Sequence, residues 1–92
     1  MKVLKIIIVD SDAGIRRRLK SFYLDAIWLN LCGKYDKQVM IEASGVVEAL
    51  PAIRTGIDIV VFSDGFPEEE SDQLLNEAGA HKMALMPIRV RL

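Results

Sequence analysis

The sequence is poor in cysteine and histidine. Its 92 residues include one cysteine, Cys32, and one histidine, His81. A lone cysteine excludes an internal disulfide and a cysteine-based zinc cluster, and His81 has no second ligand at metal-binding spacing. We therefore expect no structural zinc, and a reducing, cytoplasmic compartment for the protein.

Net charge and long apolar runs are also lacking. The chain carries 12 basic and 13 acidic side chains, so no global field attracts nucleic acid or an acidic membrane surface. The basic run Arg16–Arg18 would point in three directions on a helix, which favours a solvated face over a nucleic-acid contact. No apolar stretch approaches the roughly 20 residues of a membrane-spanning helix. We expect neither a nucleic-acid nor a membrane partner.

What is present is an unusually large apolar fraction. Hydrophobic residues make up 51% of the chain, which indicates a buried sheet, an apolar interface, or both. A chain of this length forms one domain, residues 1–92, and buries only about 60 to 70% of the surface that its unfolded form exposes. A partner can therefore contribute to its stability.

Strand and helix patterns alternate along the sequence. Short β-branched or apolar stretches predict strands over residues 3–10, 37–43 and 57–64, and a last strand that ends before Pro87. Periodic segments between them predict helices over residues 12–33, 44–55 and 67–79. Asp12 is the expected N-cap of the first helix, and Pro51 is expected to kink or break the second. This order predicts an α/β fold: a flavodoxin-like, three-layer parallel sheet of four or so strands with helices on both faces.

Four segments in the same order resemble the response regulator receiver domain of two-component signalling. They are "KIIIVDSDAGIRRRL", "VMIEASGVVEAL", "DIVVFSDGFP" and "GAHKMALMP". They are similar to that family's first strand with its acidic ending, its second strand and following helix, its phosphoacceptor strand and turn, and its Lys-Pro ending. The resemblance implies a shortened receiver-like fold, because the family's fourth strand and final helix have no counterpart here.

The resemblance also implies a phosphoryl-transfer site. The family uses acids after the first strand to hold magnesium, an aspartate four residues before the turn proline, and a lysine before the final proline. Here Asp10 matches the first acid, Ser11 replaces the second, and Asp12 matches a less regular third. Ser63 stands at the phosphoacceptor position and Met86 at the lysine position. A serine can form a phosphoester but not the labile acyl phosphate of the family.

Two alternatives remain open at this site. Asp64 would replace Ser63 as acceptor only if a bulge turned its side chain, since neighbouring residues on a strand face opposite ways. Asp10 and Asp12 either bind magnesium weakly, or end a strand and cap a helix.

The absent carboxylate and lysine favour a pseudo-receiver signalling module, which works by protein–protein interaction without aspartate phosphorylation and is not an enzyme. The alternatives are a residual phosphoacceptor or magnesium-dependent switch, and a truncated receiver that only self-associates. The protein partner is not identified by any motif. No cofactor is expected beyond weakly bound magnesium.

The first predicted helix also indicates a homodimer. Residues 21–32 are apolar at nine of twelve positions, so the helix needs cover on more than one face. We expect Phe22, Ala26 and Leu29 to pack on the sheet. A second stripe would then form the dimer interface: Leu24, Trp28 and Leu31. Alternatively, this stripe packs within one chain.

Overall fold

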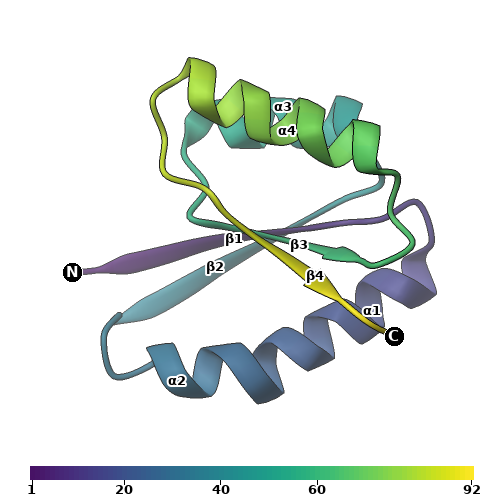
Figure 1. Ribbon diagram of the computed structural model, residues 1–92. Helices are drawn as coiled ribbons and strands as arrows, with labels where there is room; N and C mark the ends of the chain where they lie inside the picture. The colour runs from purple at the N-terminus through teal and green to yellow at the C-terminus, as the bar shows by residue number, and fades with distance from the viewer.

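The computed structural model describes residues 1–92 and contains a parallel four-stranded sheet in the order β2-β1-β3-β4 (Figure 1). The strands are β1 (Val3–Val9), β2 (Lys37–Ala43), β3 (Ile59–Ser63) and β4 (Met86–Val90). Helices cover both faces of this sheet. The predicted α/β fold, with four parallel strands between two helical layers, is confirmed.

The central strand β1 organises the sheet. All seven of its residues pair with β2, from Val3 opposite Lys37 to Val9 opposite Ala43. On its other side, Ile6–Ile8 pair with β3. Both faces of β1 are covered, so a run of β-branched residues is buried there without alternation. Because all the pairings are parallel, the carboxyl ends of β1, β3 and β4 lie at the same end of the sheet.

The two helical layers are unequal (Figure 1). One face carries a single long helical stretch made of α1 (Ala13–Phe22), a π-helical segment η1 (Tyr23–Trp28) and α2 (Leu29–Leu31). The other carries α3 (Val46–Thr55) and α4 (Glu68–Ala80). No helix combines the length and the apolar character that crossing a bilayer requires.

Local signals set the helix ends. The Asp12 side chain accepts hydrogen bonds from the backbone N–H groups of Gly14 and Ile15, at 2.7 and 3.2 Å, so the predicted N-cap is confirmed. Helix α3 runs through Pro51 to Thr55, so of the predicted kink or break, the break is wrong. Packing of Ala49 and Ile53 on the sheet, on either side of the proline, holds this helix together.

The face that the first helical stretch turns to the sheet differs from our prediction. Phe22 is 41% exposed and Leu29 67% exposed, and Ala26 is exposed as well. The core is contacted instead by residues four apart: Leu19, Tyr23, Ile27 and Leu31. The i→i+5 hydrogen bonds of η1 widen its turn beyond 3.6 residues, which keeps side chains spaced by four on one face.

This shift also changes the predicted dimer interface. Leu24, Trp28 and Leu31 are half-buried and pack against the core of their own chain. Packing within one chain, the alternative considered for this stripe, is what the structure contains. A dimer interface formed by the part of these side chains that stays exposed remains a prediction.

The last strand is displaced along the sequence. It was expected to end before Pro87, but β4 begins at Met86 and includes the proline. Because β4 lies at the sheet edge, the missing N–H of Pro87 does not interrupt the sheet. Met86 pairs with Ile59 and Val90 pairs with Ser63. Met86 thus lies at the amino end of the strands, opposite the end at which Ser63 lies.

Candidate functional site

The carboxyl ends of β1 and β3 bring Asp10 and Ser63 together. The Ser63 hydroxyl donates a hydrogen bond to Asp10 Oδ2 at 3.1 Å. The other oxygen, Oδ1, accepts from the backbone N–H of Asp12 at 2.9 Å. Asp10 is 6% exposed and Ser63 is 5% exposed. Both polar groups are buried with hydrogen-bond partners, which is what burial of such groups requires.

A cavity of about 410 Å³ opens next to this pair. Its charged lining residues are all acidic: Asp10, Asp12 and Glu70. Three serine side chains also line it: Ser11, Ser44 and Ser63. No basic side chain lies among the lining residues. This acidic lining disfavours a phosphoryl group, while two cations, Arg16 and Arg89, donate to backbone carbonyls of residues that line the cavity.

Asp10 and Asp12 both accept hydrogen bonds from within the chain. Asp12 Oδ1 accepts hydrogen bonds from the first N–H groups of α1. Both carboxylate oxygens of Asp10 also accept hydrogen bonds from within the protein. No group of three or more acidic, histidine or cysteine side chains is arranged to hold a metal ion. Asp10 therefore ends a strand and Asp12 caps a helix, and weak magnesium binding by the two stays a prediction.

Asp64 lies outside the cavity. It is exposed in the turn after β3, and its backbone N–H donates to the carbonyl of Val90 at 2.9 Å. No bulge turns its side chain toward Asp10, and Asp64 is not among the residues that line the cavity. The structure therefore separates the two candidate acceptors and places only Ser63 at the centre.

The basic residue nearest the turn is Arg89 in β4, a residue that sequence reasoning missed. Its Nη1 donates to the carbonyls of Phe66 and Ser63, at 2.9 and 3.3 Å, and Nη2 donates to the Ser71 hydroxyl at 2.7 Å. The guanidinium also lies over the Phe62 ring, 5.4 Å from its centroid. Arg89 holds the β3–α4 turn in place but does not line the acidic cavity.

Arg16 is another residue whose role was missed. We expected a solvated face, but this side chain is half-buried and donates from Nη1 to the Asp10 carbonyl at 2.6 Å. Its Nε also pairs with Glu42 Oε1 at 3.3 Å. Arg16 stands four residues after the cap Asp12, in the first turns of a helix that starts at the site. That spacing is the signal from which its contact with the site could have been predicted.

Ser44 borders the cavity from the end of β2. Its N–H and hydroxyl donate to the two carboxylate oxygens of Glu48, at 3.0 and 2.8 Å. These hydrogen bonds to the charged form, the backbone one first, lower the pKa of Glu48. The pattern fixes the start of α3, so Ser44 is a structural residue of the cavity wall.

Comparison with protein-family models and with curated proteins gives no match to the chain, so the function proposed below is supported by its own residues and their geometry.

Proposed function

We propose that the chain is a pseudo-receiver signalling module that acts by protein–protein interaction, without aspartate phosphorylation and without catalysis of its own. The observation that carries this proposal is the buried Ser63–Asp10 hydrogen bond at the strand ends. In a receiver-like site this position would need a carboxylate nucleophile facing the cavity. Ser63 fills it with a hydroxyl that is already donated to a neighbouring acid.

The charges around Ser63 support the same proposal. A transferred phosphoryl group needs a nearby cation or metal, and the cavity lining contains three acids and no base. The position assigned to the lysine is occupied by Met86, at the far end of β4. A cytoplasmic location fits the exposed free thiol of Cys32, which a reducing compartment would preserve.

Incubation with acetyl phosphate and magnesium should leave the mass of the protein unchanged. The Ser63 hydroxyl already donates to Asp10 Oδ2, a serine cannot form an acyl phosphate, and the acidic lining disfavours the phosphodonor. Intact-protein mass spectrometry after an hour at neutral pH measures this directly. A receiver domain with an intact aspartate, treated in parallel, serves as the positive control.

A stoichiometric adduct that hydroxylamine removes would contradict the proposal, because only an acyl phosphate is labile to that reagent. It would instead support the residual phosphoacceptor switch, with Asp64 or Asp10 as acceptor. The variant Asp64→Asn would then separate those two residues.

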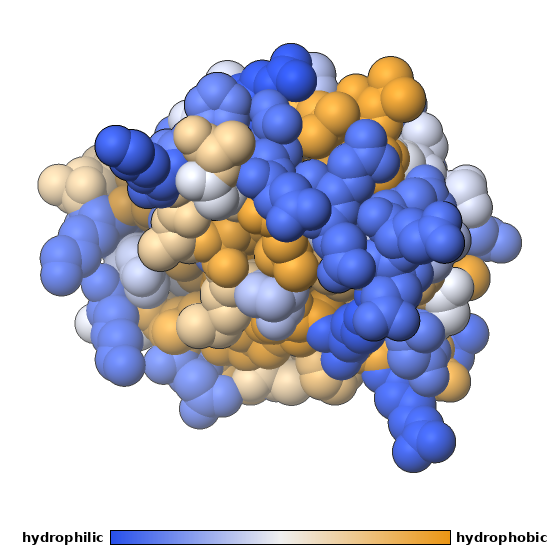
Figure 2. Space-filling view, turned by 45° about the horizontal axis from the view of Figure 1, so that its top comes forward, coloured by the Kyte–Doolittle hydropathy of each residue, from blue (hydrophilic) through white to orange (hydrophobic).

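Self-association is a second candidate function, and the free edge at β2 favours it. Seven residues without a proline form this edge, and the side chains of Val39 and Ile41 are partly exposed along it. The opposite edge, β4, contains Pro87 and so lacks one backbone donor. Hydrophilic side chains cover much of the face in Figure 2, with hydrophobic surface visible between them. A twofold pairing of β2 strands would cover the free edge.

Light scattering behind a sizing column should give twice the mass of one 10.3 kDa chain at tens of micromolar. Val39→Lys should convert this dimer to a monomer, because a lysine on an edge strand opposes pairing. Val47→Lys is the matched control, since Val47 is an exposed residue of α3 and not part of strand β2. A wild-type monomer, or equal effects of the two variants, would contradict pairing through β2.

A further inference from the structure

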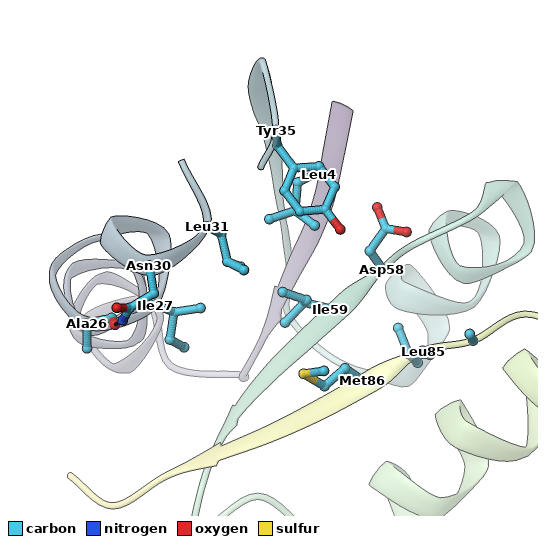
Figure 3. A pocket seen from close by; sticks show the side chains of 11 residues that line it. Leu4, Ala26, Ile27, Asn30, Leu31, Tyr35, Asp58, Ile59, Leu85 and Met86 are labelled. Carbon is cyan, nitrogen blue, oxygen red and sulfur yellow. Dashed lines mark hydrogen bonds between the residues drawn. The ribbon is translucent and has the colours of Figure 1, made fainter. Parts of the chain in front are cut away.

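A second, larger cavity lies at the amino ends of the strands, opposite the Asp10–Ser63 pair. Its volume is about 710 Å³, and it lies between the end of the first helical stretch and the start of β4 (Figure 3). The lining residues come from β1, η1, α2, the connection to β2, and the starts of β3 and β4 with the residues just before them: Leu4, Ala26, Ile27, Asn30, Leu31, Tyr35, Asp58, Ile59, Ala84, Leu85 and Met86.

This cavity exists because the two helical layers are unequal. One helical stretch covers this face of the sheet, whereas α3 and α4 cover the other. The flank toward β4 is therefore left open, and Met86 is 59% exposed there. A volume of this size lies within the range of roughly 300 to 1,000 Å³ that small-molecule sites occupy.

The lining combines an apolar wall with a single charge. Nine of the eleven residues are hydrophobic, and Asp58 is the only charged one. Asp58 Oδ2 accepts from the backbone N–H of Lys5 at 2.9 Å, and no basic side chain lies within ion-pair distance of the carboxylate. The carboxylate is exposed, is held by this one hydrogen bond, and has no ion-pair partner.

Asn30 and Tyr35 complete the polar part of the lining. The amide of Asn30 donates to the Ala26 carbonyl at 2.7 Å, which leaves its side-chain oxygen as an acceptor. In Figure 3 the Tyr35 hydroxyl and the Asp58 carboxylate lie near each other above Ile59, at the same end of the cavity. Asn30 lies away from this pair, beside Ala26 on the helix, so the pair alone places acceptors at one end of the apolar space.

We propose that this cavity binds a small organic amine, whose apolar body fills the space beside Ile27 and Ile59 and whose ammonium group pairs with Asp58. An ammonium group is the chemistry that complements an unpaired carboxylate and a neighbouring hydroxyl. An anionic ligand of the same shape is repelled by Asp58, and a neutral one gains only the apolar contact. This site is independent of the proposed docking function.

Titration with hexylamine, hexanol and hexanoate tests the proposal, with amide chemical shifts as the readout. Hexylamine at low millimolar concentration should change the amide chemical shifts of residues around the cavity. Hexanol should cause smaller changes, and hexanoate the smallest. Asp58→Asn should weaken hexylamine about fivefold and leave hexanol unchanged. This variant keeps an oxygen that can accept from the Lys5 N–H, so its fold should be intact.

Two further variants control the experiment. Ala26→Trp places a large side chain in the cavity from an exposed helix position, and it should abolish shifts by all three probes. Asp64→Asn removes an exposed acid at the opposite end of β3 and should change nothing. Equal binding of the three probes, no binding of any, or hexylamine affinity unaffected by Asp58→Asn would each overturn the proposal. So would shifts confined to the Asp10–Ser63 end.

Discussion

Replacing Ser63 with aspartate should lower the free energy of unfolding by about 3 kcal/mol at neutral pH. The substitution removes the hydroxyl that donates to Asp10 Oδ2 and puts a second carboxylate next to it, where Asp10 itself is only 6% exposed. Two neighbouring buried carboxyl groups cannot both ionise without a large cost in free energy. Urea denaturation at pH 7 measures the difference from the wild type.

The pH dependence of this variant has a definite sign. The carboxyl pair would bind a proton more tightly in the folded chain than in the unfolded one, so its pKa is raised by folding. The deficit should therefore be small at pH 4 and grow as the pH rises. Magnesium at millimolar concentration should recover part of the loss, because a carboxylate pair supplies the hard oxygen ligands that Ser63 does not.

Ser63→Asn is the matched control, because asparagine has nearly the shape of aspartate and can donate a hydrogen bond to Asp10. It should lose less stability than Ser63→Asp, and it should respond neither to pH between 4 and 7 nor to magnesium. If the two variants behave alike, size rather than charge decides at this position. The acidic description of the cavity would then be wrong.

Tyr23 should make the protein sensitive to alkali. Its ring is fully buried, its hydroxyl has no hydrogen-bond partner, and burial raises its pKa to about 12 from the usual 10.0. Above pH 10 the unfolded chain releases this proton and the folded chain does not, so the stability present below pH 10 is lost as the pH rises through 12. The loss attributable to Tyr23 should reach about 2 to 3 kcal/mol.

Tyr23→Phe removes this ionisable hydroxyl, so the variant should not show the part of the stability loss above pH 10 that is due to Tyr23. At pH 8 the variant should be as stable as the wild type or about 1 kcal/mol more stable, since it deletes a buried hydroxyl without a partner. Its advantage should then grow between pH 10 and 11.5. Tyr35→Phe makes the same chemical change at a half-buried ring and should show no such growth. If the free energy of unfolding of the wild type and of Tyr23→Phe changed with pH in parallel, the burial of an ionisable hydroxyl at this position would be contradicted.

Much of the fold could be predicted because its signals are local. The β2 bounds, Lys37–Ala43, agree with the prediction, and β1 ends one residue before the predicted Asp10. Asp12 caps its helix as expected, because the cap depends on a side chain and the N–H groups two and three residues later. The layer order follows from alternation of strands with helices, which also depends only on neighbouring segments.

The features that could not be predicted depend on contacts between distant segments. A period of 3.6 placed Phe22 and Leu29 on the sheet, but both are exposed, and the wider turn of η1 keeps Tyr23, Ile27 and Leu31 on that face instead. Pro87 was taken to end the last strand, but an edge position makes a proline harmless there. Arg89 acquired its partners 18 to 26 residues away only once β4 had paired with β3. Sequence spacing carries no record of such pairings.

The hydrogen bonds from Arg89 to the β3–α4 turn make the stability of that turn depend on the edge strand β4. Edge strands open more readily than central ones, and each opening of β4 withdraws the donors that reach Phe66, Ser63 and Ser71. Amide protons of β4, the turn and the first turn of α4 should then exchange with solvent as one cooperative unit. Those of β1 should exchange only on global unfolding. The mouth of the acidic cavity therefore belongs to the part of the protein that opens most easily, and its Asp10 floor to the part that opens last.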